Sequence, residues 1–240
     1  MQFKKATTHF ALFLFAVLFF QKESAAQLLQ CKAELKNDML VLENSRLKRT
    51  FFWNKKNVEN HLEIYFYDAI TAWHFNAQYH CTAKSGIGIT ISWFNEVMPD
   101  IYDRLYPKDS NSKWNFASHV PGIVVVNLFQ NDSWLVNMPD HEKFEIRYGN
   151  NKTSEALIID AYKFFITPIR SKYPKAHVIC SLGDMDATRE GFLWPAYIDS
   201  VVSKLNDKKI TTHFFPSEGA PGHPVTKDHE TMAADLIAYI

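Results

Sequence analysis

Short apolar runs alternate with amphipathic segments along the second part of the chain. The runs Gly122–Phe129 and Ala176–Leu182 are rich in β-branched and apolar residues, a composition typical of strands buried on both faces. Between them, Thr153–Tyr173 carries apolar residues at helical spacing, and Thr153 or Ser154 can cap its first turn. The pattern therefore predicts a strand, a helix and a second strand in succession.

The same alternation continues on both sides of this core. It predicts helices at Tyr67–Phe75, Phe94–Leu105, Trp194–Asp207 and the last residues of the chain, and strands at Ala77–Ala83 and Lys209–Phe215. Strands that alternate with helices favour a parallel sheet covered on both faces. We therefore expect the α/β class, as a three-layer α/β/α sandwich with a mostly parallel, flavodoxin-like sheet. In such sheets the chemistry lies in the loops that leave the carboxyl ends of the strands.

The first residues have the pattern of a secretory signal peptide. Met1–Ala26 begins with basic residues, continues through the apolar run Phe10–Phe20 and ends with the small residues Ser24–Ala26. The apolar run is short for a bilayer span, although an uncleaved anchor is the alternative interpretation. We expect a mature chain that begins near Gln27, is secreted or periplasmic, and has no integral membrane association.

Residues 27–60 fit the alternating pattern less well. Met39–Asn54 has the character of two β segments around a turn, followed by a polar, loop-like stretch. This part can supply the first strand of the parallel sheet or form a separate β module. The expected organisation is a signal peptide at 1–26, an N-terminal segment at 27–60 and an α/β domain at 61–240.

Composition narrows the function classes. The 240 residues have 47% hydrophobic content and a formal net charge of zero, so there is no electrostatic reason to expect nucleic acid as a partner. Three cysteines, Cys31, Cys81 and Cys180, do not make a disulfide framework, and we expect Cys81 and Cys180 to be buried thiols. No spacing suggests a metal site, and we expect no cofactor.

Three loops after predicted strands carry residues suited to acyl transfer. They are Lys84–Ile89, Gln130–Trp134 and Pro216–Pro224. Their glycines let backbone N–H groups approach a ligand, their asparagine offers an amide donor, and their histidine offers a base. Together these groups can stabilise an oxyanion and move a proton.

From Tyr65 to Ile240 the chain resembles the SGNH, or GDSL-like, hydrolases, and most of all carbohydrate esterase family two. The resemblance lies in the motifs AKSGIGI, VVVNLFQNDSW, VICSLGDMD and GHPVTKDHETMAADL. It implies that Gly86 or Gly88 and Asn131 form the oxyanion hole, and that His223 is the catalytic histidine. His229 matches a later histidine of the family, for which we expect a structural role.

Three departures from the family pattern stand out. Phe129 occupies the position at which the third block of the family begins with glycine, and Ala220 replaces the aspartate that usually orients the histidine. Glu218 is a possible substitute for that aspartate. The nucleophile block Gly-Asp-Ser is altered as well. It can be laid over Glu43–Ser45, which makes Ser45 the candidate nucleophile; the alternative is that this stretch is a β-hairpin of another module and the block is missing.

The resemblance implies a secreted serine esterase that removes acetyl groups from polysaccharide, without a metal or cofactor. Its partner would be an acetylated polysaccharide or oligosaccharide, and Trp93 and Trp134 are candidates for stacking on sugar rings, although both can equally be packing residues. Two alternatives remain open. The chain can be a catalytically degenerate protein of the same fold that binds carbohydrate or is a truncated remnant, or an acylhydrolase or thioesterase that acts on lipids.

Overall fold

The computed structural model describes residues 32–36, 39–43, 47–53, 58–64, 66–106, 108–216 and 223–240. The chain separates into two compact units, Met1–Ile64 and Tyr65–Ile240. The signal-peptide prediction for Met1–Ala26 lies outside the described residues, as does Cys31.

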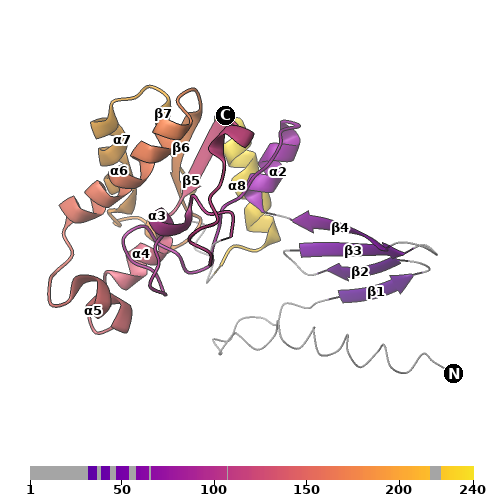
Figure 1. The fold of residues 1–240 in the computed structure, drawn as a ribbon, viewed down its shortest axis with the longest axis horizontal. Helices are drawn as coiled ribbons and strands as arrows, with labels where there is room; N and C mark the ends of the chain where they lie inside the picture. The colour runs from indigo at the N-terminus through magenta and orange to yellow at the C-terminus, as the bar shows by residue number, and fades with distance from the viewer. Residues whose placement is uncertain are drawn as a thin grey trace. The chain divides into compact units, whose positions relative to one another are not determined.

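The first unit contains an antiparallel sheet of strands β1 (Lys32–Lys36), β2 (Met39–Glu43), β3 (Leu47–Trp53) and β4 (Val58–Ile64), paired in that order (Figure 1). Successive strands that follow one another through short connections pair as hairpins without a crossover. The polar stretch expected to be a loop thus contains β4, because pairing with β3 satisfies its backbone groups where its own sequence has weak strand character.

The segment around Ser45 is a hairpin. Strand β2 pairs antiparallel with β3, and Glu43 lies opposite Lys48 in the register. Leu47–Trp53 is a strand, whereas an elbow after a first parallel strand would lead into a helix. Of the two interpretations of this stretch, the one that made β2 the first strand of the parallel sheet is therefore wrong. Ser45 itself lies outside the described residues.

The second unit is built on a parallel sheet in the order β5 (Ile123–Asn127), β6 (His177–Leu182) and β7 (Ile210–Phe214). Its helices are α2 (Tyr67–His74), α3 (Met98–Ile101), α4 (Gln130–Leu135), α5 (Glu142–Tyr148), α6 (Glu155–Lys172), α7 (Trp194–Leu205) and α8 (Thr226–Tyr239), with 3-10 helices η1 (Phe116–Ser118) and η2 (Asp186–Thr188). The predicted adjacency of the first two of these strands is confirmed.

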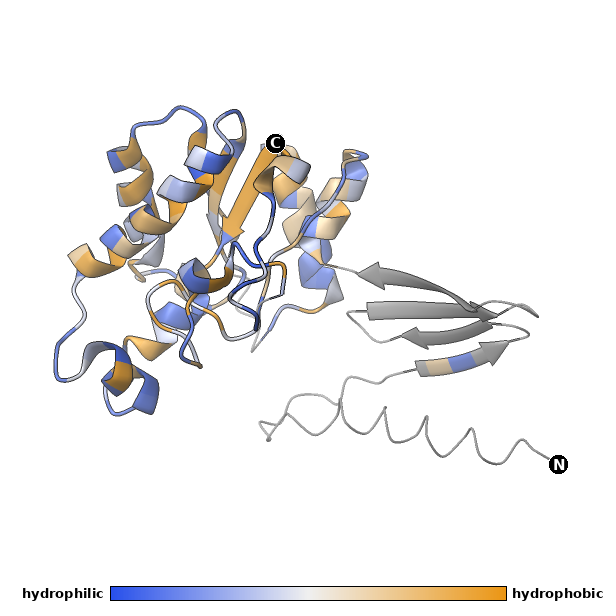
Figure 2. Cartoon of the chain, in the orientation of Figure 1, coloured by the Kyte–Doolittle hydropathy of each residue, from blue (hydrophilic) through white to orange (hydrophobic). Residues whose placement is uncertain are grey.

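Side chains that alternate along the strands supply two apolar layers. Val126, Cys180 and Leu182 face the core that α6 and α7 cover. Their neighbours Val125 and Ile179 face the opposite way, toward apolar side chains of α8. Figure 1 shows α6 and α7 on one side of the sheet and α8 on the other, and Figure 2 shows the hydrophobic strands between them. β6 is almost completely buried and β5 is partly buried on both faces, which accounts for their nearly continuous apolar sequences.

Three sequence predictions in the segment before the sheet differ from the structure. Ala77–Ala83 forms no regular strand, and Cys81 is exposed, whereas Cys180 is buried as expected. Among the described residues no strand pairs with this segment, so its backbone has no ladder to join. The helix expected at Phe94–Leu105 shortens to α3, which has Pro99 in its first turn, a position that suits a residue without an N–H.

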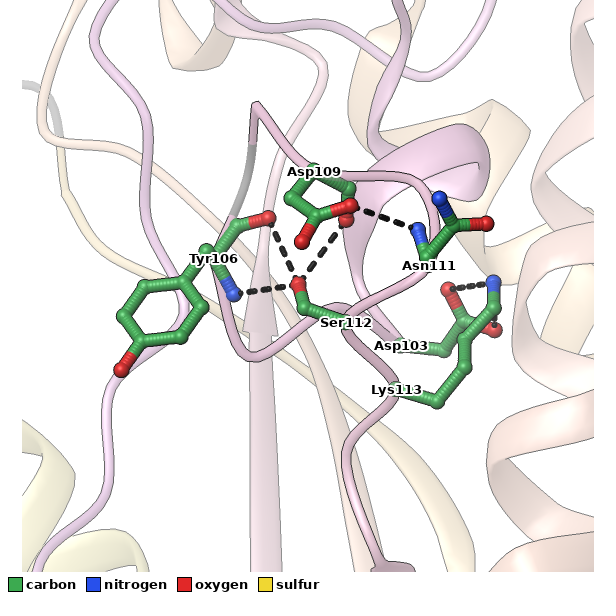
Figure 3. Close-up of polar contacts among 6 residues, drawn as sticks. All are labelled: Asp103, Tyr106, Asp109, Asn111, Ser112 and Lys113. Carbon is green, nitrogen blue, oxygen red and sulfur yellow. Dashed lines mark hydrogen bonds and ion pairs between the residues drawn. The ribbon is translucent and has the colours of Figure 1, made fainter.

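The connection between α3 and β5 is held by local polar contacts. The Ser112 hydroxyl lies 3.0 Å from the Tyr106 carbonyl oxygen and 2.8 Å from that of Asp109, and it accepts a 2.9 Å hydrogen bond from the Tyr106 N–H (Figure 3). Lys113 pairs with Asp103 at 2.9 Å across the same loop. Ser112 therefore serves to fold its own loop.

Among the helices in the described part of the chain, none has the length and apolar character that crossing a bilayer requires. This finding does not extend to Phe10–Phe20, which lies outside the described residues.

We predict that Ser154→Ala lowers the free energy of unfolding by about 1 kcal/mol, because its hydroxyl caps α6. The Ser154 oxygen accepts a 3.2 Å hydrogen bond from the Leu157 N–H. Urea unfolding monitored by circular dichroism measures the change. Ser154→Asp should retain most of the stability and Thr153→Ala should have little effect; equal losses for Thr153→Ala and Ser154→Ala would contradict the capping role.

Candidate active site

The candidate site lies at the carboxyl edge of the parallel sheet. Strands β5, β6 and β7 end at Asn127, Leu182 and Phe214, and because they are parallel, their following loops leave from one edge. The loops that follow β5 and β6 therefore open on the same edge, as expected for strands of one parallel sheet. Of the third loop, residues 217–222 lie outside the described part, so its course is known only as far as Pro216 and again from His223.

The glycine loop folds back on itself. Gly86 has a φ of +81°, a left-handed conformation that glycine adopts without steric cost. Its carbonyl oxygen accepts a 3.1 Å hydrogen bond from the Trp93 N–H. Inside this closed turn, the Gly88 N–H donates to the Ser92 hydroxyl at 2.9 Å. The loop is therefore a compact turn whose shape depends on its two glycines.

The Asp132 carboxylate holds this loop against the start of α4. Its oxygens accept hydrogen bonds from the backbone N–H groups of Ile89 (3.0 Å), Thr90 (2.6 Å) and Ile91 (3.3 Å), and from the Thr90 hydroxyl at 2.7 Å. Asp132 is fully buried. Burial raises the pKa of this carboxyl, and the four donors oppose the rise. Asp132 thus ties the glycine loop to the first turn of α4.

Close packing distinguishes the two glycines. A Cβ on Gly88 would lie 2.0 Å from the Ile91 carbonyl oxygen and 2.5 Å from an Asp132 oxygen, so this position admits no side chain. The Gly88 N–H is already committed to Ser92. No hydrogen bond from the Gly86 N–H to any described residue is formed, and Gly86 is therefore the stronger candidate oxyanion donor of the two.

The Asn131 side chain is fixed by two hydrogen bonds. Its Nδ2 donates to the Ile87 carbonyl oxygen at 2.8 Å, and its Oδ1 accepts from the Trp93 indole N–H at 3.0 Å. An amide nitrogen carries two hydrogens, so the first contact leaves the second for another acceptor. The structure thus brings Asn131 together with the glycine loop, as the predicted oxyanion hole requires.

Phe129, which stands where the family pattern has glycine, adopts a left-handed backbone conformation. It has a φ of +95° at the N-cap of α4, a region where a bulky residue is uncommon. Its ring is fully buried, 4.7 Å from the Tyr162 ring centre and 5.1 Å from that of Trp194. We infer that these core contacts offset the backbone strain, so that α4 begins with Asn131 correctly placed despite the missing glycine.

The two tryptophans differ in their surroundings. Trp93 is 39% exposed, packs against Gly86 and meets the His141 ring edge-on at 5.3 Å between centres. Trp134 is half-buried and donates its indole N–H to Asp186 at 3.1 Å, which links α4 to η2. Trp93 therefore lies beside the predicted oxyanion donors, while Trp134 connects α4 to η2.

The two histidines of the last motif occupy different environments. His223 is exposed, and Glu218 and Ala220, which precede it, lie outside the described residues. His229 is buried on α8, and its Nδ1 accepts a 3.4 Å hydrogen bond from the Tyr67 N–H. The structure thus joins His229 to the first turn of α2, a contact that fits the structural role expected for it.

The first turn of α2 is a part of this edge that the sequence analysis missed. Asn127 at the end of β5 donates to the Tyr67 hydroxyl at 3.2 Å and to the Gly183 carbonyl oxygen at 2.9 Å. Asp68 accepts from the Ala69 N–H at 2.9 Å and from the Tyr79 hydroxyl at 2.6 Å. Tyr67-Asp68-Ala69 therefore starts α2 beside the ends of β5 and β6, at the edge where the candidate site lies.

The described serines of α4 and β6 serve the fold. The Ser133 hydroxyl donates to the Gln130 carbonyl oxygen at 2.7 Å, and the Ser181 hydroxyl donates to that of His213 at 2.8 Å. Both serines are buried. Within the described ranges, no cluster of three or more histidine, cysteine, aspartate or glutamate residues is arranged to hold a metal ion.

We predict that Gly88→Ala displaces the glycine loop, because its Cβ would overlap the Ile91 carbonyl and the Asp132 carboxylate. The free energy of unfolding should fall by roughly 1–3 kcal/mol or more, the usual cost of overpacking a fitted site. Chemical denaturation measures it. Gly122→Ala is the matched control, since nothing lies within 4 Å of a Cβ there; similar stability for both variants would show that the loop is not fixed by this contact.

Comparison with known proteins places this geometry in a family. No family model matches the chain. Among curated proteins, the chain is 34% identical over 186 residues to "Cellulase/esterase CelE" of Acetivibrio thermocellus, a match that covers 72% of this chain and 21% of that protein. The chain thus spans about a fifth of the length of this relative.

Solved structures of carbohydrate esterases also match the chain. A family two carbohydrate esterase from Clostridium thermocellum in complex with cellohexaose matches with a TM-score of 0.59 and 31% identity, over 72% of this chain and 52% of that one. An acetyl xylan esterase from the rumen bacterium Butyrivibrio proteoclasticus matches with a TM-score of 0.58 and 26% identity, over 72% and 53%. The chain spans about half of each. It is a homologue of the family two carbohydrate esterases and shares their SGNH hydrolase fold.

Proposed function

We propose that this chain is an exported carbohydrate esterase that removes acetyl groups from polysaccharide or oligosaccharide. The observation that carries the proposal is the assembled oxyanion arm, in which Asp132 holds the glycine loop beside the oriented amide of Asn131. Preorganised donors of this kind stabilise the negative oxygen of an acyl-transfer transition state. Export rests on the signal-like pattern of Met1–Ala26.

In the proposed reaction, a serine hydroxyl attacks the acetyl carbonyl carbon, and His223 takes the hydroxyl proton. The Gly86 N–H and the second Asn131 N–H bind the oxyanion that forms. The tetrahedral intermediate then collapses, the sugar oxygen leaves, and His223 returns the proton to it. Water hydrolyses the acetyl-serine through the same groups and releases acetate. Losing one oxyanion donor typically costs about 2.7–4 kcal/mol of transition-state stabilisation. The candidate serine is Ser45.

Two relatives support carbohydrate as the substrate class. One solved relative is a family two carbohydrate esterase in complex with cellohexaose, and another is an acetyl xylan esterase. Exposed Trp93 beside Asn131 offers an aromatic face on which a sugar ring can stack. A lipid or thioester substrate would make less use of this polar, aromatic rim.

We predict that His223→Ala lowers kcat on acetylated xylo-oligosaccharide by roughly 10³-fold or more, because the reaction loses its base. Ser45→Ala should abolish turnover and labelling by a serine-directed phosphonate. Acetate release and mass spectrometry measure these effects. His74→Ala, which changes an exposed histidine at the end of α2, is the control. Full activity in His223→Ala would contradict the proposal, and faster turnover of a long-chain acyl ester would redirect it to lipid.

A second function, carbohydrate binding without turnover, is favoured by a specific observation. Ala69 stands in the first turn of α2, where Asn127 and His229 contact Tyr67 at the edge of the sheet. The strands that flank Ser45 form a hairpin outside the parallel sheet. If Ala69 occupies the place of the nucleophile, the site keeps its oxyanion arm and lacks the attacking hydroxyl.

This second function predicts that wild type binds acetylated xylo-oligosaccharide in calorimetry but releases no acetate, and that Ala69→Ser gains measurable hydrolysis and phosphonate labelling. An added hydroxyl in reach of a base is what nucleophilic catalysis requires. Ala72→Ser, on the same helix, is the matched control. Turnover by wild type that Ser45→Ala abolishes would refute this function and support the first.

A further inference from the structure

Trp93 contacts both predicted oxyanion donors. Its indole N–H donates to Asn131 Oδ1 at 3.0 Å. Its ring packs on Gly86, where an added Cβ would lie 3.3 Å from Trp93 Cδ1. Its backbone N–H closes the glycine turn through the 3.1 Å hydrogen bond to the Gly86 carbonyl oxygen. One residue thus joins the backbone donor and the side-chain donor.

The indole contact decides which way the Asn131 amide faces. An amide can be turned over, which exchanges its oxygen for its nitrogen at little cost unless neighbours distinguish them. Trp93 offers only a donor, so it demands the Asn131 oxygen, while the Ile87 carbonyl oxygen demands the nitrogen. The two contacts together fix the amide with one N–H left over, and a turned amide would present its oxygen to an oxyanion and repel it.

Part of Trp93 remains accessible to solvent. The side chain is 39% exposed and is held edge-on to His141 at 5.3 Å between ring centres. A ligand that stacks on this exposed face would press the indole onto Gly86 and keep its N–H on Asn131. Trp93 can therefore contact a sugar ring while it holds the Asn131 amide, which binds the oxyanion in the proposed reaction.

We propose that Trp93 is a positioning residue that orients the Asn131 amide for the oxyanion, and that a sugar ring on its exposed face strengthens this orientation. The inference rests on the proposed esterase function for its kinetic consequence. The orientation of Asn131, in contrast, is a property of the protein itself and can be measured without turnover.

The first test is Trp93→Phe, which retains an aromatic face and removes the N–H. We expect kcat to fall roughly 2- to 10-fold, as for loss of one neutral hydrogen bond, while KM changes less than about twofold. In an Asn131→Ala background, Trp93→Phe should have no further effect on kcat, because the two residues act as one unit. Trp73→Phe, at an exposed position in the last turn of α2, is the control. Equal losses of kcat in both backgrounds would overturn the proposal.

The second test needs no catalysis and separates failure of this proposal from failure of the proposed function. In ¹⁵N-labelled protein, the side-chain amide signals that Asn131→Ala removes belong to Asn131. We expect Trp93→Phe to shift them and to increase their exchange with water, and acetylated xylo-oligosaccharide to slow that exchange in wild type. Unchanged signals in Trp93→Phe would refute the orienting role, even if the enzyme proved active. Shifted signals in a protein without turnover would support it while the esterase function failed.

Discussion

The buried Asp132 carboxylate is the interaction on which the candidate site depends. It accepts from three successive backbone N–H groups and one hydroxyl, which together satisfy the donors of a loop that has no other secondary structure. A buried charge without such partners would be very costly, and a buried loop without an acceptor equally so. The carboxylate supplies acceptors for the N–H groups of the loop, and the loop supplies donors for the carboxylate. Asp132 is in the first turn of α4, next to Asn131. The glycine loop and Asn131 are therefore both anchored to this turn.

Apolar side chains complete this attachment. Ile87 and Ile89 belong to the main core, while Ile91 packs with Leu135 and Phe144 of α4 and α5. The Gly-Ile-Gly-Ile-Thr-Ile sequence therefore sends its isoleucine side chains into the core and the N–H groups of its last three residues toward Asp132. Phe129 contributes in the same manner from the other side, with a left-handed backbone held by a buried ring. The site is built as an extension of the core, and its precision is that of a packed interior.

The predicted oxyanion donors and the predicted nucleophile belong to different units of the chain. The predicted oxyanion donors are assembled within the second unit, whereas Ser45, the serine that the motif alignment offered, lies outside the described residues, between two strands of the first unit. The start of α2 lies at the carboxyl edge of the sheet and carries Ala69. The two proposed functions, an esterase and a carbohydrate-binding protein of this fold, share the oxyanion donors and differ in whether a serine hydroxyl can reach the reacting carbonyl. The distinction between them is one oxygen atom in the right place.

Several features were determined by the sequence alone. Nearly continuous apolar, β-branched runs predicted β5 and β6, because strands buried within a parallel sheet have no polar side to alternate with, and β7 was predicted from the alternation of strands with helices. Ser154 and the apolar periodicity fixed α6, and the Gly-rich, Asn-Asp and His-Pro motifs pointed to one edge of the sheet. Tertiary structure decided the rest. Ala77–Ala83 has strand character but no partner strand, Phe129 keeps the conformation of a glycine only because core rings hold it, and the amide of Asn131 takes its orientation from Trp93, 38 residues away in sequence. Such choices depend on long-range contacts, and local patterns of hydrophobicity contain no information about which distant residue will be there.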